Sequence, residues 1–263
     1  MQQYPYWLQQ SPDKALFPDI DWNKPEQRHR AGKLGIIGGN KLSFAAIAEG
    51  YSTSLKTGAG EVKVLLPDAL KQAIPTTITE AIFAPSNISG SLNRQATAEV
   101  QALGQWADGL LLIGDAGRSS ETSIVYEELL ESYSGWLTLT RDAIDLVSAS
   151  NHILVERPKT LLVLSYAQLQ KLFRSVYYPK MITFSLQLAN LVEVLHKFTT
   201  TYPITLVTLY KDHLVIVSDG RVVTMPWSKP MDIWRGKAAA SAATYLLWND
   251  SQPLEAVASS VLS

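Results

Sequence analysis

Short runs of consecutive apolar residues recur along the chain and alternate with stretches of helical spacing. Apolar runs bounded by glycine or proline are typical of strands buried on both faces, whereas apolar residues spaced by one helical turn are typical of helices. The predicted core strands are 34–37, 62–65, 110–113, 136–139, 161–164, 204–209, 214–217 and 222–225. The predicted helices are 43–56, 92–106, 120–133, 142–147, 166–176, 184–198, 236–248 and 254–262.

This alternation predicts an α/β fold. Buried strands separated by helices form a parallel sheet with helices on both faces. The last two strands flank Asp219-Gly220, a dipeptide typical of tight hairpins, so an antiparallel C-terminal edge is expected. The prediction is a three-layer αβα sandwich with a mainly parallel central sheet, as one domain over residues 31–263. Residues 1–30, rich in Pro, Asp, Gln and Arg, are predicted to be an irregular lead-in.

The amino-acid composition excludes several kinds of site and partner. The chain has no cysteine, which excludes a disulfide framework, a thiolate zinc site and a cysteine nucleophile. Its 23 basic and 24 acidic residues give a net charge of −1, so neither a nucleic-acid partner nor a membrane partner is expected. The N-terminus does not have the pattern of a signal peptide, and no apolar run reaches the ~20 residues of a membrane span. We expect a soluble, cytoplasmic protein.

Two predicted turns follow core strands and precede helices. In parallel sheets ligands bind beyond the carboxyl ends of the strands, where backbone amides and helix N-termini face the crevice. The first turn is Gly38-Gly39-Asn40, which either forms a tight turn alone or lets a ligand approach the backbone. The second runs from Gly114 to Arg118, where free amides and an arginine predict either an anion site or a capped turn.

Two further segments carry charge at the same edge of the predicted sheet. Asp142 follows a strand, so its carboxylate either binds a ligand or metal or caps its own helix. Arg235 and Lys237 flank Gly236 at the start of a helix rich in small residues. Cations are disfavoured at a helix N-terminus, so this pair indicates either an anionic ligand between them or a solvated helix end.

Several well-known sites are absent from the sequence. It contains no P-loop, no Gly-x-Gly-x-x-Gly after the first strand and no Gly-x-Ser-x-Gly nucleophile elbow. The four histidines lack metal-ligand spacing, so no protein metal site is predicted.

Three segments together resemble the ADP/ATP-dependent NAD(P)H-hydrate dehydratase family, which has the ribokinase-like fold. They are Gly35-Ile36-Ile37-Gly38-Gly39-Asn40 with Phe44-Ala45-Ala46 and 56–62, the turn 113–122, and Thr140-Arg141-Asp142-Ala143-Ile144. These are similar to the family's opening strand and helix, its Gly-Pro-Gly-Leu-Gly turn and its Asp-Ala-Asp-Ala-Leu segment. The similarity extends from near Gly32 to the C-terminus.

The resemblance implies a function and a set of site residues. The family removes water from hydrated NADH or NADPH: a nucleotide phosphorylates the added hydroxyl, and phosphate then leaves. The implied cofactors are ATP or ADP, with Mg²⁺. The implied substrate- or nucleotide-binding residues are Gly39, Asn40, Ala46, Gly114, Asp115, Gly117, Arg118, Ser165, Arg235 and Gly236.

The sequence departs from the family at the catalytic positions. Lys237 stands where the family has the aspartate that activates the hydroxyl. A lysine with a pKa near ~10.4 is protonated at neutral pH and cannot accept a proton from an alcohol. Val163-Leu164-Ser165-Tyr166-Ala167-Gln168 replaces Thr-Pro-His-Pro-Gly-Glu. The sequence therefore predicts a diverged homologue that binds a nucleotide or phosphate, with little or no dehydratase activity.

Other hypotheses stay open at this point. One is an active dehydratase with a rearranged site, in which Asp115, Asp142 or Asp232 serves as base. Another is a small-molecule kinase of the ribokinase-like fold. A third is non-catalytic: aromatic residues make a homo-oligomer or partner interface if they are exposed. The aromatic candidates are Tyr177, Tyr178, Trp227 and Trp234.

Overall fold

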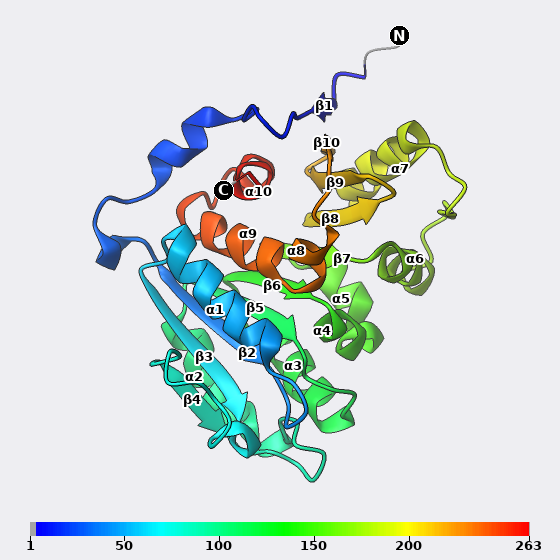
Figure 1. Ribbon diagram of the computed structural model, residues 1–263. Helices are drawn as coiled ribbons and strands as arrows, with labels where there is room; N and C mark the ends of the chain where they lie inside the picture. Colours follow the sequence, from blue (N-terminus) through cyan, green and yellow to red (C-terminus); the bar gives the residue numbers. More distant parts are fainter. Residues whose placement is uncertain (1–3, 263) are drawn as a thin grey trace.

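The computed structural model describes residues 4–262 and arranges them around one ten-stranded sheet (Figure 1). The strand order is β1-β10-β9-β8-β7-β6-β5-β2-β3-β4. The strands are β1 (Trp7–Gln9), β2 (Lys33–Gly38), β3 (Glu61–Pro67), β4 (Ala81–Ala84), β5 (Gly109–Gly114), β6 (Trp136–Thr140), β7 (Thr160–Leu164), β8 (Ile204–Tyr210), β9 (His213–Ser218) and β10 (Arg221–Pro226). The seven strands that lie between β4 and β8 in the sheet, both included, are parallel. Strand β9 is antiparallel to both β8 and β10. The predicted sheet type is confirmed.

Helices cover both faces of the sheet. Helices α1, α9 and α10 pack with one buried apolar cluster, and α2, α3, α5, α6 and α7 pack with the other (Figure 1). The helices are α1 (Ala45–Thr57), α2 (Thr97–Trp106), α3 (Ser120–Ser132), α4 (Asp142–Leu146), α5 (Asn151–Glu156), α6 (Tyr166–Ser175), α7 (Leu188–Thr201), α8 (Pro230–Trp234), α9 (Lys237–Trp248) and α10 (Pro253–Ser260). Since apolar side chains on both faces of each central strand need cover, the continuous apolar runs produce this three-layer sandwich.

The predicted hairpin between β9 and β10 is confirmed. Asp219 and Gly220 both have positive φ, +48° and +68°, and join strands that pair in antiparallel register. Both central residues of a type I′ turn require positive φ, which Asp and Gly tolerate better than most residues. Asp219 and Gly220 therefore form the turn that reverses the chain between β9 and β10.

The N-terminal segment contains a strand that the sequence analysis did not predict. Trp7–Gln9 pairs with β10 in parallel and forms the outermost strand. The Trp7 indole N–H donates to the Thr224 hydroxyl at 2.8 Å, and the buried Gln10 side chain donates to the Ala258 carbonyl at 2.8 Å. Residues 1–3 of the predicted irregular lead-in 1–30 lie outside the described residues. Within residues 4–30 the prediction was wrong at this strand and at two 3₁₀ helices, Pro18–Asn23 and Arg28–Arg30.

Two predicted helices begin later than expected. The helix predicted from residue 92 begins at Thr97, because the Asn93 side chain accepts the Gln95 amide and caps a short 3₁₀ turn instead. The helix predicted from residue 184 begins at Leu188, since the carbonyls of Phe184 and Leu186 both accept the Tyr210 hydroxyl. The short elements β4, α5 and α8 were not predicted.

Helix α9 lies deep against the sheet. Ala239 and Ala240 are fully buried and Ala242 is nearly so, because their small side chains let the helix approach β5 and β6 closely. This depth brings the N-terminus of α9 to the carboxyl end of the sheet. No helix among residues 4–262 is both long and apolar enough to span a bilayer.

We expect the substitution Ala242→Leu to destabilise the fold by about 1–3 kcal/mol, because the added methylenes overpack the space between α9 and the sheet. Urea denaturation measures this loss in the free energy of unfolding. Ala167→Leu, at an exposed position of α6, is the matched control and should leave the value nearly unchanged. Equal losses in the two variants would contradict the close packing of α9.

Candidate functional site

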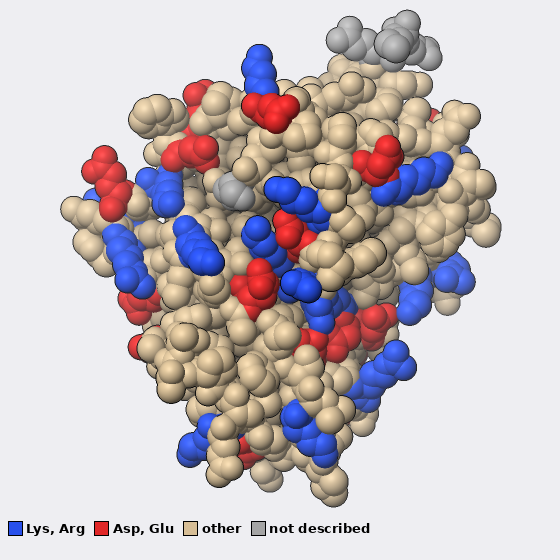
Figure 2. Space-filling view, in the orientation of Figure 1, with Lys and Arg blue, Asp and Glu red and all other residues tan. Residues whose placement is uncertain are grey.

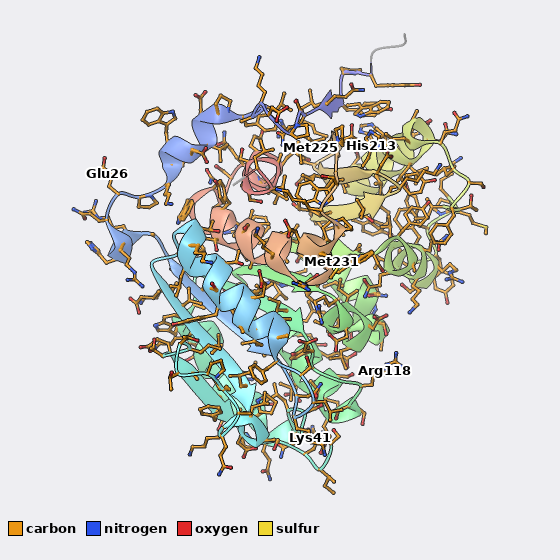
Figure 3. All side chains as sticks on the ribbon, in the orientation of Figure 1. Glu26, Lys41, Arg118, His213, Met225 and Met231 are labelled. Carbon is orange, nitrogen blue, oxygen red and sulfur yellow. The ribbon has the colours of Figure 1, made fainter. Side chains whose placement is uncertain are left out.

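The segments singled out in the sequence meet at the carboxyl edge of the sheet. Strands β2, β5, β6 and β7 are parallel, so the turns that follow them lie at the same edge. Figure 3 labels Lys41 and Arg118 near the turns after β2 and β5, and Met231 on α8. The Gly39 amide donates to the Gly114 carbonyl at 2.9 Å, which joins the first two turns directly.

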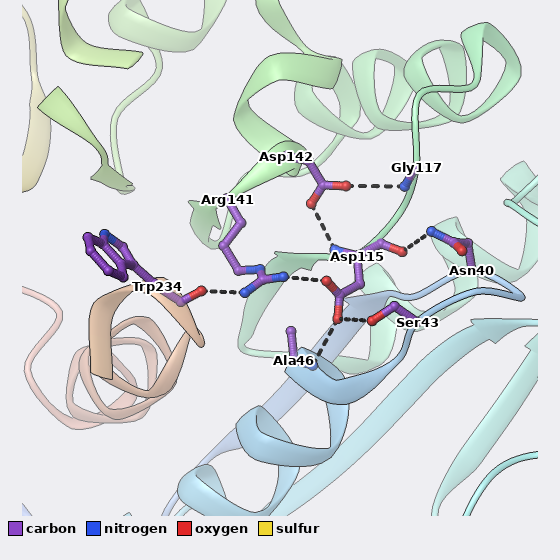
Figure 4. Close-up of polar contacts among 8 residues, drawn as sticks. All are labelled: Asn40, Ser43, Ala46, Asp115, Gly117, Arg141, Asp142 and Trp234. Atoms are coloured by element: carbon purple, nitrogen blue, oxygen red, sulfur yellow. Dashed lines mark hydrogen bonds and ion pairs between the residues drawn. The ribbon is translucent and has the colours of Figure 1, made fainter. Parts of the chain in front are cut away.

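Asp142 fills the turn that follows β5. Its carboxylate accepts the Asp115 amide at 2.8 Å and the Gly117 amide at 3.1 Å (Figure 4). A Cβ atom at Gly114 would overlap the Asp142 carboxylate, so only glycine fits there. Two of the turn's amides, those of Asp115 and Gly117, are therefore occupied by the protein's own carboxylate and are not free for an anion. Of the two alternatives left open by the sequence, this contact agrees with a closed turn rather than with an anion site at these two amides.

Burial changes the titration of Asp142. Loss of hydration raises the pKa of its carboxyl, and the neighbouring Asp115 carboxylate adds to this, whereas the amides of Gly117 and Asp115 partly oppose it. A carboxyl with these contacts is a structural acceptor that holds the turn closed.

The Asp115 side chain connects the β5 turn to the start of α1. One carboxylate oxygen accepts the Ser43 hydroxyl and the Ala46 amide, both at 3.0 Å, and so caps α1 from outside the helix. The Asn40 side chain donates to the Asp115 carbonyl at 2.6 Å. Asp115 has positive φ (+54°) and its side chain is 9% exposed. The Asn40 side chain and the Ala46 amide, both from residues predicted to bind a ligand, are therefore hydrogen-bonded to Asp115.

A single arginine links this carboxylate to α8. The Arg141 guanidinium forms an ion pair with Asp115 and donates to the Trp234 carbonyl (Figure 4). We call these three residues the Arg141 bridge. Arg141 has φ +59° and ψ −139°, a backbone conformation that is costly for any residue with a side chain. The contacts of its side chain and its carbonyl, which accepts the Gln168 side chain at 2.8 Å, hold it there.

The N-terminus of α9 lies beside the Arg141 bridge. Gly236 precedes the helix with φ +86°, and a Cβ atom on it would lie 2.9 Å from the Ile113 side chain and 3.9 Å from Arg141 Cδ. No side chain caps α9, and its first backbone bond runs from the Ala240 amide to the Gly236 carbonyl at 3.0 Å. The amides of residues 237–239 therefore have no acceptor in the helix. Such amides, with the helix dipole, favour an anion.

Three charged side chains surround this helix end. Lys237 Nζ lies 3.7 Å from the Asp232 carboxylate, and their side chains are 43% and 28% exposed. Arg235 is exposed and makes no ion pair within residues 4–262. Figure 2 shows Lys and Arg side chains together with a few acidic ones over the middle of this face, where α8 and α9 lie in Figure 1. The helix end thus carries one unpaired and one weakly paired cation.

Arg118 and Ser165 have other surroundings than the α9 end. Arg118 is exposed and lines a pocket of about 520 Å³ that adjoins the β5 turn, because Gly117 and Asp142 line it too. Its other polar lining residues are Ser120, Ser123 and the ion pair of Lys171 with Asp145. Ser165 caps α6: its hydroxyl accepts the Gln168 amide at 3.2 Å in a capping box. Within the described part of the chain, no group of three His, Asp or Glu residues could hold a metal ion.

No family model and no curated protein matches this chain, but solved structures do. A ribokinase-like superfamily protein from Enterococcus faecalis aligns with 17% identity and a TM-score of 0.75 over 100% of this chain and 88% of its own. The ADP/ATP-dependent NAD(P)H-hydrate dehydratase from Bacillus subtilis, co-crystallised with ATP and Mg²⁺, aligns with 10% identity and a TM-score of 0.63 over 90% and 79%. The fold is ribokinase-like. At these identities the likeness concerns the fold alone.

In this ribokinase-like chain the sequence analysis missed three residues of the site. Arg141, Ser43 and Gln168 make the contacts that join Asp115, α8 and the turn after β6. One signal was available, because Arg141 stands where the resembled family has an alanine in Asp-Ala-Asp-Ala-Leu. A charged residue at a small-residue position next to Asp142 indicates a new contact, although not with which partner.

We expect the stability of the protein to depend on pH through Asp142. Because its pKa is raised, the folded protein binds this proton more tightly than the unfolded chain does, so the stabilisation is largest below the ordinary Asp pKa and is lost as pH rises through the raised value. Urea denaturation from roughly pH 3 to pH 7 measures this dependence. The difference in the free energy of unfolding between wild type and Asp142→Asn should change over that pH range. The corresponding difference for Asp13→Asn, at an exposed position, should not show the same change. A constant difference for Asp142→Asn would contradict the raised pKa.

Proposed function

We propose that this chain binds the phosphate groups of ATP or ADP at the N-terminus of α9 and does not turn over hydrated NADH. The observation that carries the proposal is Lys237. It occupies the first position of α9, where the resembled family has its catalytic aspartate, and it is paired with Asp232 at 3.7 Å. A cation at this position attracts phosphate and cannot serve as the general base.

The other carboxylates at the edge of the sheet do not replace the missing base. Both oxygens of Asp142 accept backbone amides, and both oxygens of Asp115 are engaged by Ser43, Ala46 and Arg141. Asp232 faces Lys237. A general base needs a free acceptor directed at the substrate hydroxyl, whereas each of these carboxylates is engaged within the protein. These contacts support binding without catalysis.

Several groups at the α9 end favour phosphate. The amides of residues 237–239 have no acceptor in the helix, and the helix dipole adds about +0.5 charge at this end. Lys237 and Arg235 add two cations, and Arg141 Cδ is near Gly236. Charge-assisted hydrogen bonds from such groups are the strong ones in phosphate recognition.

The residues present fit a nucleotide better than they fit a resident metal ion. Trp234 is 55% exposed next to Arg235, and an exposed indole can stack on a nucleobase. Mg²⁺ is bound mainly by phosphates, waters and one or two carboxylates. Asp232 is the carboxylate closest in sequence to the α9 end, so Mg²⁺ would enter with the nucleotide, and Asp232 is the residue that would help to hold it.

We expect wild-type protein to be stabilised against heat by ATP and ADP and less by inorganic phosphate. A ligand at 100 times its dissociation constant stabilises the folded state by about 2.7 kcal/mol, which a thermal-shift assay detects. Lys237→Glu should weaken ATP binding by at least about tenfold, because it replaces attraction with repulsion. Lys71→Glu, an exposed position remote in sequence, should leave binding unchanged. Equal affinities in wild type and Lys237→Glu would contradict the proposed site.

We expect no multiple-turnover consumption of hydrated NADH with either ATP or ADP. Turnover that Asp232→Ala abolishes would instead favour an active dehydratase with a rearranged site. The kinase alternative draws on a structural neighbour, the phosphomethylpyrimidine kinase of Clostridium difficile, with 12% identity and a TM-score of 0.50 over 82% of this chain and 91% of its own. Phosphate transfer from ATP to any member of a panel of small alcohols would favour that alternative.

A further inference from the structure

A second surface, distant in sequence from the nucleotide site, combines exposed apolar side chains with cations. Of the eight large apolar residues that are exposed in the described part of the chain, three fall within one short loop after α6. They are Tyr177, Met181 and Phe184, at 92%, 82% and 65% exposure. With Arg174 and Lys180 they form what we call the 174–184 surface. Clustered exposed apolar residues mark an interaction site.

The 174–184 surface carries positive charge without compensating acid in the same segment. The sequence contains no Asp or Glu from Arg157 to Val192. Arg174 and Lys180 make no ion pair within residues 4–262, whereas Lys171 pairs with Asp145 at 3.1 Å. Figure 2 shows Lys and Arg atoms at the flank where α6 lies in Figure 1.

Two carboxylates in the neighbouring elements have cationic partners of their own. Glu193 on α7 pairs with Lys197 at 2.5 Å, and Asp212 pairs with His213 at 2.8 Å when that histidine is protonated. Lys180 is close enough to Glu193 to contribute to the lowered pKa of that carboxyl, but neither Lys180 nor Arg174 forms an ion pair within residues 4–262, so both can meet an outside partner.

The loop is held in place with Ile182 buried and with Tyr177, Met181 and Phe184 exposed. It folds back along α6, where the Gln170 side chain donates to the Ile182 carbonyl at 2.8 Å and the Tyr166 hydroxyl donates to the Thr183 carbonyl at 2.9 Å. Arg174, Lys180 and Met181 line one hollow of about 240 Å³. Because these contacts fix the backbone, the exposed side chains need little reordering to meet a partner.

We propose that the 174–184 surface docks on an anionic lipid surface. Its apolar side chains protrude, so they suit insertion among lipid headgroups, and its unpaired cations complement anionic lipids. A two-fold contact of this surface with its own copy would bring cations of the same sign together, which opposes that arrangement. The overall charge of −1 hides this local asymmetry, and the expectation of no membrane partner rested on that overall charge. The docking is peripheral, and it does not depend on the nucleotide site.

Sedimentation of the full chain with vesicles tests the proposal. One set contains phosphatidylcholine alone and the other also contains phosphatidylserine. We expect preferential binding to the second set, and at least about tenfold weaker binding for the double variant Arg174→Glu/Lys180→Glu, since each cation near an anionic surface contributes to binding. Met181→Ser/Phe184→Ser should weaken it as well. Circular dichroism confirms that each variant is folded.

Matched controls come from exposed residues elsewhere. Leu42→Ser/Ile88→Ser removes two apolar side chains that are 85% and 100% exposed, and Lys14→Glu reverses one exposed cation. Both should bind vesicles like wild type. Absence of binding to either vesicle, or equal binding by wild type and the double charge variant, would overturn the proposal. A third outcome would also overturn it: wild type binds no vesicles but self-associates with rising concentration, and the Met181→Ser/Phe184→Ser variant does not self-associate. The partner of this surface would then be a second copy of the chain.

Discussion

The ion pair between Asp115 and Arg141 is the contact on which the carboxyl edge of the sheet depends. Asp115 caps α1 through the Ser43 hydroxyl and the Ala46 amide, and Arg141 extends the connection to the Trp234 carbonyl at the end of α8. The side chains are 9% and 28% exposed, so the pair is largely removed from water. Removing one partner would leave the other charge partly buried, which costs more than the intact pair contributes. Both backbones take costly positive φ values to make this contact.

In this arrangement, polar groups that could contact a ligand make contacts within the protein instead. The amides of a glycine-rich turn could bind an anionic ligand, but here Asp142 supplies the anion from within the chain. The carboxylate of Asp115, which could orient a ligand, instead caps a helix. At the α9 end the first amides have no acceptor in the helix and lie next to Lys237 and Arg235. The carboxylates of Asp115 and Asp142, by contrast, are engaged in contacts that stabilise the fold.

Much of the fold was predictable because strand and helix periods are local properties. The apolar runs of β5 and β7 and the Asp219-Gly220 turn each identify an element without knowledge of the rest of the chain. The strand β1 was not predictable, since its three residues show no alternation and it is defined by pairing with β10, more than 200 positions away. The late start of α7 also depends on a distant residue, Tyr210.

The candidate site was predictable only as a set of neighbouring turns. Parallel strands place Gly114, Asp142 and Gly236 at one edge, and the sequence analysis put candidates at each of them. It could not predict that the Asp142 carboxylate would enter the turn of Gly117, because that depends on the positive φ of Arg141 and the space left by Gly114. The partners of Arg141 lie 26 and 93 positions away, so no local pattern indicates them.

Phosphate binding at the α9 end is tested most directly by an ADP titration of deuterated wild-type protein, followed by amide ¹H–¹⁵N NMR. We expect the amide resonances of Lys237, Ala238 and Ala239 to shift progressively, because these groups acquire a phosphate acceptor that the helix does not provide. The amides of Asp115 and Gly117 should shift much less, since Asp142 already occupies them. Shifts confined to the turn at residues 114–118, or none at saturating ADP, would contradict phosphate binding at the α9 end.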